Sequence, residues 1–337
     1  MTVKRKCLMF AAAFCACLTL AGCGDGKDVR EEPEEEAARM ISIGFSQLGN
    51  ESDWRVANTE SMKNTFTEAR GYELLMEDAQ QKQEKQIAAI RNYLLRNVDY
   101  IVLAPVVETG WDEVLQEAKD AGVPVIIMDR MVKTEDDSLY AAWVGSDMQA
   151  EGEKAIRWLE NELQEKDRDQ EEISIVHLQG TEGSTAQIGR TEGLTEGLKK
   201  HPGWRLAAQE NGEFTQAKAY EVMKEILKKN RDIDVVYCEN DNETFGVMQA
   251  LDEFGITYGE KGDVILISFD ATEAGLTACM NGKINLEVEC NPLHGPRVEA
   301  IIRQMEAGEQ PDQKVYVDEL VFEPEDLSEE LIASRGY

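Results

Sequence analysis

Residues 99–129 have the sequence DYIVLAPVVETGWDEVLQEAKDAGVPVIIMD, in which two short apolar runs flank an amphipathic stretch. The runs at 99–104 and 124–129 favour β-strands. The stretch at 111–121 has the apolar spacing of a helix, which Gly122 brings to an end. A strand, a helix and a second strand in this order form a parallel unit with a right-handed crossover. The segment therefore predicts an α/β fold with a parallel sheet.

The same alternation extends along the rest of the chain. Before residue 99, strands are predicted at 40–46 and 72–77, and helices near 53–69 and 82–97. After residue 146 the pattern begins again, with strands near 173–178, 204–209, 234–238, 263–269 and 285–290, and helices near 184–199, 216–229, 242–254 and 272–281. We therefore expect an α/β fold of two doubly wound parallel-sheet domains, with a ligand in the cleft that they share.

The N-terminal residues 1–22 have the pattern of an export signal. A basic segment, Lys4 to Lys6, precedes an apolar run that is too short to span a bilayer. The run ends in LAGC at 20–23, which resembles the lipobox of bacterial lipoproteins, so we expect cleavage before Cys23 and attachment of a lipid to it. The alternative is ordinary secretory cleavage, with the cysteine as a bystander.

The next residues have the composition of a tether. They show no apolar periodicity and contain the acidic run EEPEEE around Pro33, so 23–39 is predicted to be a lipidated cysteine and a disordered acidic tether. The alternative is the first turn of a helix, which Pro33 would interrupt. These features predict an exported protein held at the outer face of the cell membrane, on the periplasmic side where an outer membrane exists.

The composition limits the partners. The formal net charge is −31, and because phosphate binding needs the opposite sign, we expect no nucleic-acid partner. The roughly 300 residues after the tether exceed what one typical core supports, which favours two domains.

Of the seven cysteines, three lie in the predicted signal peptide and Cys23 is the predicted lipid site. The other three, Cys238, Cys279 and Cys290, lie in or beside apolar segments, which favours buried thiols, although one disulfide pair among them stays open.

Polar and aromatic side chains gather where predicted strands end. In the first half they are Trp54, after strand 40–46, and Asp129 and Arg130, at the end of strand 124–129. In the second half they are Arg190, Phe214, Asn240, Asp270 and Glu289. Ligands of such sheets bind beyond the carboxyl ends of the strands, so these residues form a candidate binding site.

This mixture of side chains suits a sugar, whose hydroxyl groups both donate and accept hydrogen bonds. Carboxylates accept such bonds, guanidinium groups donate them in parallel pairs, and aromatic rings pack on the apolar face of the sugar. We assign as acceptors Asp129, Asp270 and Glu289, as donors Arg130 and Arg190, as both Asn240, and as ring platforms Trp54 and Phe214. Buried charges of opposite sign would compensate one another.

Each assignment has a structural alternative. The aromatic residues could pack in the core, the aspartates and Asn240 could cap helices, and the arginines could form surface ion pairs. Glu289 could lie at a solvated edge. The shared position of all these residues at one end of two sheets favours the binding site.

Several motifs resemble those of one protein family. They are GFSQ at 44–47, Trp54-Arg55, QQKQE at 80–84, APVV at 104–107 with TGW at 109–111, Asp129-Arg130 and LQGT at 178–181. With them the chain, from about residue 41 to residue 337, resembles the sugar-binding proteins of bacterial ABC importers in the ribose- and galactose-binding cluster, which have the type I periplasmic binding protein fold. Within that cluster it is most similar to galactofuranose-binding members.

The resemblance implies a monomeric protein that binds a monosaccharide and delivers it to the permease of an ABC importer. It implies sugar contacts at Trp54, Arg55, Asp129, Arg130, Arg190, Phe214, Asn240, Asp270 and Glu289; Arg55 is the addition to the residues above. Departures from the galactofuranose-binding pattern at Asn50, Asp53, Glu239 and Ala271 leave the identity of the sugar open.

The resemblance and the restart of the strand pattern also imply discontinuous lobes. The N-terminal lobe would comprise 40–145 and 290–316, and the C-terminal lobe 146–289 and 317–337. Three hinge crossings would then lie near Gly145, Asn291 and Val317.

Two other classes of function compete with this interpretation. An enzyme is the first, because carboxylates at strand ends also occur in hydrolases. The sequence has no nucleophile elbow, phosphate loop or metal-ligand spacing, so we expect no catalytic residue, cofactor or metal, although carboxylates alone leave a glycosidase open. The second is a sensor that presents its sugar to a membrane receptor or kinase, which the sequence does not separate from an importer component.

Overall fold

A computed structural model of the protein describes residues 39–337. The predicted signal peptide, Cys23 and all of the predicted tether except Arg39 lie outside the described residues. Within residues 39–337, no helix combines the length and the apolar character that crossing a bilayer requires.

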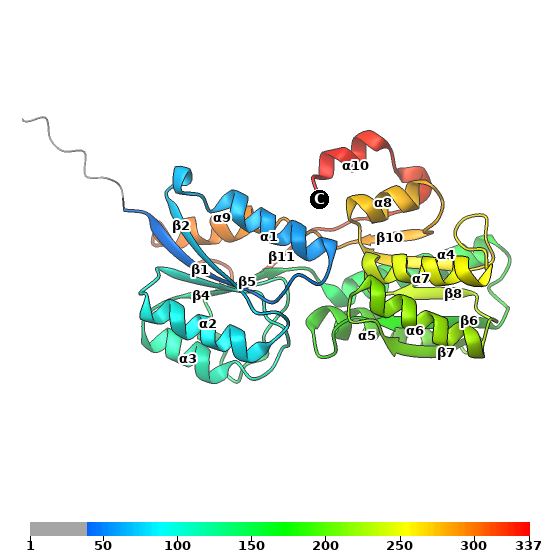
Figure 1. Ribbon diagram of the computed structural model, residues 1–337, viewed down its shortest axis with the longest axis horizontal. Coiled ribbons are helices and arrows are strands. Elements are labelled where there is room, and N and C mark those ends of the chain that lie inside the picture. Colours follow the sequence, from blue (N-terminus) through cyan, green and yellow to red (C-terminus); the bar gives the residue numbers. More distant parts are fainter. Residues whose placement is uncertain (1–38) are drawn as a thin grey trace, which may run out of the picture. The chain divides into compact units, whose positions relative to one another are not determined.

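The first sheet contains six parallel strands (Figure 1). They are β1 (Ile41–Gln47), β2 (Tyr72–Asp78), β3 (Tyr100–Leu103), β4 (Val125–Met128), β5 (Ala142–Gly145) and β11 (Lys314–Tyr316). Their order is β11-β5-β4-β3-β1-β2, so the direction of winding reverses between β1 and β3. Such a reversal leaves a crevice beyond the carboxyl ends of the two strands.

The second sheet repeats this arrangement with one antiparallel strand at its edge. Its strands are β6 (Ile173–Gln179), β7 (Trp204–Asn211), β8 (Val235–Cys238), β9 (Ile265–Asp270), β10 (Leu286–Glu289) and β12 (Val321–Phe322). Their order is β12-β10-β9-β8-β6-β7, and β12 pairs antiparallel to β10. The winding reverses between β6 and β8, as it does between β1 and β3 in the first sheet.

Helices cover both faces of the first sheet (Figure 1). They are α1 (Asp53–Thr65) and α9 (Gly295–Glu306) on one face, and α2 (Gln83–Leu95) and α3 (Asp112–Asp120) on the other. The alternation of side chains along β3 produces the two cores: Val102 packs in the core that contains Met62 of α1, whereas Ile101 packs in the core that contains Trp111. Because both of their faces are buried, the central strands β3 and β4 are apolar throughout.

The second sheet is covered in the same way. Its helices are α4 (Met148–Glu165), α5 (Thr185–Lys200), α6 (Gln216–Lys229), α7 (Asp241–Phe254), α8 (Glu273–Met280) and α10 (Glu329–Arg335). Ile175 of β6 packs with Leu159 of α4, and its neighbour Val176 packs with Met223 of α6. The short α8 and α10 pack together through Leu276 and Ile332. We call each sheet with its helices a lobe.

The two α/β lobes confirm the predicted fold class, and every strand predicted from the sequence is present. The prediction missed β5, and it missed β11 and β12, whose three and two residues are too few to show a periodicity of their own. It also missed α4, α9 and α10, although Ile156, Leu159 and Leu163 of α4 have helical spacing. Cys238, Cys279 and Cys290 are free and buried, as predicted.

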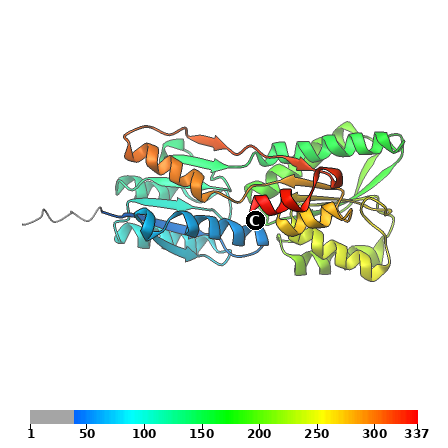
Figure 2. The ribbon, with the colours of Figure 1, turned by 90° about the horizontal axis from the view of Figure 1, so that it is seen from above.

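The chain passes between the sheets three times, after β5, after β10 and after β11. Figure 2 shows the last crossing, where the C-terminal segment leaves the first sheet and reaches the second. The assignment of residues to lobes at the boundaries given above stays a prediction, which measured relative motion of the two parts would test.

A buried amide fastens the ends of β1 and β3 beside the crevice of the first sheet. Gln86 of α2 donates from Nε2 to the carbonyl of Ala104 at 2.7 Å, and its Oε1 accepts from the backbone N–H of Val106 at 2.9 Å. The carbonyl of Val106 in turn accepts from Nη1 of Arg130 at 2.9 Å. Gln86 thus fixes the loop that contains Val106, and the carbonyl of Val106 in turn holds the candidate site residue Arg130.

We predict that Gln86→Ala lowers the free energy of unfolding by about 2 kcal/mol, because it leaves buried backbone groups without partners. Urea unfolding monitored by circular dichroism measures this change. Gln116→Ala, on the exposed face of α3, is the matched control and should change the midpoint little. Equal midpoints for the two variants would contradict the proposed role of Gln86.

Candidate functional site

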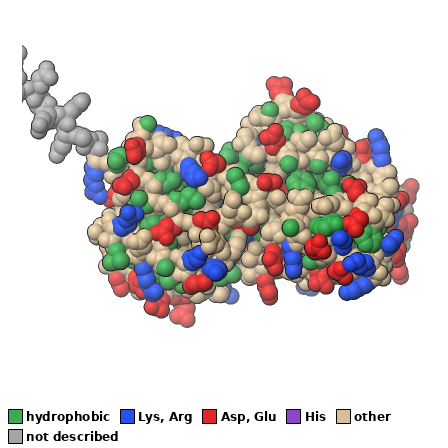
Figure 3. Space-filling model, viewed as in Figure 1, with side chains coloured by type: hydrophobic (Ala, Val, Ile, Leu, Met, Phe, Trp, Pro, Cys, Tyr) green, Lys and Arg blue, Asp and Glu red, His purple; other side chains and the backbone are tan. Residues whose placement is uncertain are grey.

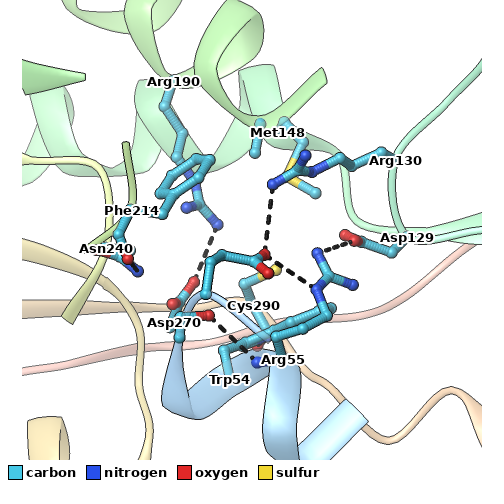
Figure 4. Close-up of a pocket in the computed structure, with 13 residues that line it drawn as sticks. Trp54, Arg55, Asp129, Arg130, Met148, Arg190, Phe214, Asn240, Asp270 and Cys290 are labelled. Carbon is cyan, nitrogen blue, oxygen red and sulfur yellow. Dashed lines mark hydrogen bonds and ion pairs between the residues drawn. The ribbon is translucent and has the colours of Figure 1, made fainter. Parts of the chain in front are cut away.

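A cavity lies between the carboxyl ends of the two sheets and contains about 290 Å³ of space free of protein atoms. Eight of the nine predicted contacts line the cavity: Trp54, Arg55, Asp129, Arg130, Arg190, Phe214, Asn240 and Asp270. The structure therefore brings together residues from both halves of the sequence (Figure 4).

The fold positions these residues at the points where winding reverses or beside them. Trp54 and Arg55 lie in the first turn of α1, which follows β1, and Ser52 caps that helix by accepting from the N–H of Arg55. In the second lobe, Asn240 follows β8 and caps α7 by accepting from the N–H of Glu243. Its capping role, one of the alternatives above, is therefore real and coexists with its place in the cavity.

Three cavity residues have a backbone conformation that side chains rarely adopt. The φ angles are 63° for Asp129, 59° for Phe214 and 106° for Asp270. Such angles cost free energy and persist only where surrounding contacts enforce them, and they cluster at functional sites.

Charges in the first lobe form a closed network around Glu51. Nη2 of Arg55 lies 2.7 Å from Oδ2 of Asp129, and its Nε lies 3.1 Å from Oε1 of Glu51. Nη2 of Arg130 lies 3.6 Å from the same Glu51 oxygen. All four side chains are at most 5% exposed, so each charge depends on its partners rather than on water.

Burial and neighbouring charges shift these groups in opposite directions. Burial by itself raises the pKa of Asp129, but the positive charges of Arg55 and Arg130 outweigh it and lower that pKa below its usual value. Burial and the adjacent Arg55 lower the pKa of Arg130 to about 10, despite the opposing effect of Glu51. Asp129 therefore remains a carboxylate at neutral pH.

The second lobe contributes one arginine with its own partners. Nε of Arg190 lies 2.7 Å from Oε2 of Glu151, and its Nη2 lies 3.4 Å from Oδ1 of Asp270. Its Nη1 also donates to the backbone carbonyl of Glu239. Burial, reinforced by nearby carboxyl groups that include Asp241, raises the pKa of Asp270 well above its usual value against the effect of Arg190.

Apolar side chains complete the walls. Trp54, Met148, Ala186, Phe214 and Cys290 form one buried cluster, to which both lobes contribute. Nε1 of Trp54 donates to the carbonyl of Cys290 at 2.6 Å, which fixes the indole ring. The guanidinium of Arg130 lies 5.5 Å from the centre of the Phe214 ring, within range of a cation–π contact.

Gly180 explains how Phe214 reaches the cavity. A Cβ atom at Gly180 would lie 1.9 Å from the nearest atom of the Phe214 ring, so only glycine lets the ring occupy this place. The glycine-rich segment after β6 therefore serves close packing.

Two polar atoms of the network have no protein partner among the described residues. They are Oε2 of Glu51 and Nη1 of Arg55, and both are buried. Buried polar atoms are nearly always hydrogen-bonded, so this acceptor and this donor in the cavity wall are candidates for contact with a ligand.

Hydrogen bonds join the two lobes at the rim of the cavity. The backbone N–H of Asp53 donates to Oδ1 of Asn242 at 3.0 Å, and Nδ2 of Asn242 donates back to Oδ2 of Asp53 at 3.3 Å. On another part of the rim, the N–H of Met131 donates to Oγ1 of Thr185 at 2.8 Å. These few exposed or half-buried bonds are the kind that open at small cost.

Glu289 is the predicted contact that the structure does not bring to the cavity. Its carboxylate binds Arg335 and accepts from the hydroxyl of Tyr337 at 3.1 Å and from the N–H of Leu320 at 2.9 Å. Glu289 follows the third strand out from the winding reversal, whereas Asn240 and Asp270 follow the first and second. We therefore leave Glu289 out of the proposed ligand contacts.

Comparison with known proteins places this fold and cavity in one family. The family model described as "Periplasmic binding protein domain" matches residues 43–288. The chain belongs to this family. It is 37% identical over 298 residues to the galactofuranose-binding protein of Escherichia coli (strain K12), which covers 87% of this chain and 91% of that protein.

Two solved structures of the family are also similar to this chain. A Mycobacterium smegmatis protein in complex with β-D-fucofuranose has a TM-score of 0.81 and 38% identity, covering 88% of this chain and 97% of that chain. The periplasmic binding protein component of the arabinose ABC transporter from Shewanella sp. ANA-3, bound to α- and β-L-arabinofuranose, has a TM-score of 0.80 and 37% identity, covering 88% and 95%. The two-lobed fold is therefore that of type I periplasmic binding proteins.

Five residues that line the cavity were missed by the sequence analysis: Glu51, Ser52, Met148, Ala186 and Cys290. Glu51 gave a usable signal, because it stands between β1 and Trp54 and lies four residues before Arg55, a spacing that pairs opposite charges. The other four are small or apolar side chains without a distinctive pattern.

We predict that two similar substitutions differ in how much they change the free energy of unfolding. Asp129→Asn should lower the free energy of unfolding at pH 7 by about 3 kcal/mol, because it removes the charge that compensates two buried arginines. Asp270→Asn should change it by less than about 1 kcal/mol, because the raised pKa of Asp270 favours a neutral side chain there already.

Urea unfolding of both variants over a range of pH measures this contrast. Since the pKa of Asp129 is lowered on folding, its contribution is present above the ordinary pKa of 3.8 and is lost as the pH falls further. The difference in free energy of unfolding between the wild type and Asp129→Asn should therefore disappear at acid pH. Equal losses in the two variants at pH 7 would contradict the assigned charges.

Proposed function

We propose that this protein is the substrate-binding lipoprotein of an ABC sugar importer and holds one monosaccharide, in a furanose ring form, in the cavity between its lobes. The observation that carries the proposal is the pair of partnerless buried atoms, Oε2 of Glu51 and Nη1 of Arg55, in a cavity walled by two aromatic rings. One unpaired acceptor and one unpaired donor in the cavity wall suit the hydroxyl groups of a sugar, which both donate and accept.

The proposed contacts divide by chemistry. Trp54 and Phe214 would pack against the C–H faces of the ring. The carboxyl groups of Glu51, Asp129 and Asp270 would accept from hydroxyl groups, and Nδ2 of Asn240 would donate. The guanidinium groups of Arg55, Arg130 and Arg190 would donate.

The relatives support a furanose over a pyranose. The similar proteins named above carry galactofuranose in their description or contain a bound fucofuranose or arabinofuranose. Even with the space open to solvent, the cavity contains only about 290 Å³ free of protein atoms, which is too little for an oligosaccharide. The permease partner, the lipid on Cys23, the export signal and the monomeric state belong to this proposal.

A raised and a lowered carboxyl pKa, such as those of Asp270 and Asp129, also occur together in glycosidases, so they do not decide between binding and catalysis. The similar proteins named above are described as binding proteins, so we expect binding without catalysis. An assay with nitrophenyl glycofuranosides should therefore show no turnover. Release of nitrophenol would support the enzyme instead.

Calorimetry tests the ligand class. D-Galactose, D-fucose and L-arabinose interconvert between ring forms in water, so each should bind with an apparent affinity below that of the corresponding furanose locked as its methyl glycoside, unless the glycoside methyl group clashes. Binding of pyranosides alone would overturn the ring-form assignment. Absence of heat with every monosaccharide would overturn the proposed function.

We predict that Trp54→Ala and Arg190→Ala each weaken sugar binding by about 2 kcal/mol or more, through lost ring packing and an unpaired sugar acceptor. Isothermal titration calorimetry measures the dissociation constants. Trp158→Ala and Arg157→Ala, on α4 away from the cavity, are the matched controls and should bind as the wild type does. Unchanged dissociation constants in the cavity variants would remove the assigned site.

Binding should also close the two lobes, because residues of both lobes touch one small ligand only when the cavity is narrow. The sugar would favour the closed state by its additional contacts there. Small-angle scattering should give a smaller radius of gyration with saturating sugar than without it. An unchanged radius would mean that one lobe binds alone.

A further inference from the structure

One carboxyl group joins the three segments that cross between the lobes. Glu319 lies in the last crossing, and its Oε1 accepts from the hydroxyl of Ser146 at 2.6 Å and from the backbone N–H of Asn291 at 2.7 Å. Ser146 directly follows β5 in the first crossing, and Asn291 lies in the second. Lys154 of α4 donates to the backbone carbonyl of Glu319 at 2.8 Å. The side chain of Glu319 is thus the common point of all three crossings.

A second carboxyl group, that of Glu151 in α4, lies beside Glu319. Oxygen atoms of the two carboxyl groups and Sγ of Cys290 all lie within 4.8 Å of one another. Oε2 of Glu151 accepts from Nε of Arg190 at 2.7 Å, whereas its Oε1 is buried without a donor among the described residues. A buried and a half-buried carboxylate this close would repel, and Glu151 would keep an unpaired oxygen.

A single proton removes both problems. If Glu319 is a carboxylic acid, its O–H can donate to Oε1 of Glu151, while its other oxygen keeps the bonds from Ser146 and Asn291. The proton belongs on Glu319 because Glu151 has the guanidinium of Arg190 as its counter-charge. In agreement, burial and the charge of Glu151 raise the pKa of Glu319 to about 9.

We propose that Glu319 is a positioning residue: as a neutral acid it donates a hydrogen bond to Glu151, holds Glu151 against Arg190, and so couples the three crossings to the cavity. The consequence for sugar binding rests on the proposed function, because Arg190 is one of the proposed donors. The protonation state itself does not depend on that function.

Other charged groups around the pair are consistent with one shared proton. The groups that face it are Lys154 of α4, Arg190 of α5, Asp270 at the end of β9, Glu289 at the end of β10 and Cys290 after it. The thiol pKa of Cys290 is raised well above its usual value by burial and by both glutamates. With a protonated thiol and a guanidinium beside it, the cluster suits a proton rather than a divalent cation.

The pH dependence of sugar affinity is the first test, measured by calorimetry from pH 6 to pH 10. The wild type should bind with constant affinity up to about pH 8 and lose about tenfold by pH 10, as Glu319 ionises next to Glu151. Glu319→Gln keeps a neutral donor and should bind within about twofold of the wild type at pH 7. It should lack the loss above pH 8 that is specific to Glu319. Arg130 is present in both proteins, so the difference between them isolates Glu319.

Two further variants sharpen the comparison. Glu319→Ala removes the donor and both accepted bonds, so it should bind at least about tenfold more weakly at every pH. Glu325→Gln, an exposed glutamate of the same segment, is the control and should follow the wild-type profile. Identical pH profiles for the wild type and Glu319→Gln would overturn the proposal, as would tight binding of Zn²⁺ to the wild type that is lost in Glu319→Gln.

Unfolding without sugar tests the proton independently of the proposed function. Because the pKa of Glu319 rises from 4.5 to about 9 on folding, its native form holds a proton that the unfolded chain releases between these values. The stability of the wild type relative to Glu319→Gln should therefore be greatest below pH 4.5 and fall as the pH rises to about 9. If no sugar binds but this slope is present, the proposed function fails and the proton assignment stands. A flat difference would overturn the assignment even where sugar binds.

Discussion

The structure depends on the compensation of three buried guanidinium groups between two parallel sheets. Arg55, Arg130 and Arg190 are each almost completely excluded from water, and an isolated charge in such a place would be prohibitively costly. Carboxyl groups within a few ångströms, with the backbone carbonyls of Val106 and Glu239, make these charges tolerable. Stability and the proposed sugar recognition would therefore depend on the same network.

The exposed charges contribute less to stability than the buried ones. On the face shown in Figure 3, acidic and basic side chains are interspersed and exposed, and ion pairs between exposed groups contribute little.

Compensation occurs within each lobe rather than between them. Arg55 and Arg130 are matched by Glu51 and Asp129, all from the first lobe, whereas Arg190 is matched within the second lobe. Separation of the lobes would thus leave no buried charge without its partner, and the contacts to be broken are a few rim hydrogen bonds and aromatic packing. This partition is what a protein needs if a weakly bound ligand is to shift it between two arrangements. A charge pair across the cleft would instead hold the lobes together without a ligand.

The sequence was sufficient for the fold because buried parallel strands are apolar throughout and alternate with amphipathic helices, as residues 99–129 show. It was sufficient for most of the cavity because strand ends on one side of a doubly wound sheet meet. It failed at Glu289, since strand-end position alone does not say how far a residue lies from the reversal of winding. It also failed at Glu51 and Cys290, whose importance arises from contacts between segments far apart in the chain, such as the bond from Trp54 to the carbonyl of Cys290.

For the same reason, no local sequence pattern reveals the contacts of Glu319 among the three crossing segments. Ser146, Asn291 and Glu319 are separated by more than a hundred and by nearly thirty residues, yet they converge on one carboxyl oxygen. Crossing segments between two rigid sheets must absorb any rotation of the lobes, so a group bonded to all three experiences every change in their relative arrangement. Glu151 then connects that group to Arg190 in the cavity wall. Under the proposed function, a sugar at Arg190 and a proton on Glu319 would act on one continuous chain of contacts, which would link sugar recognition to the geometry of the crossings.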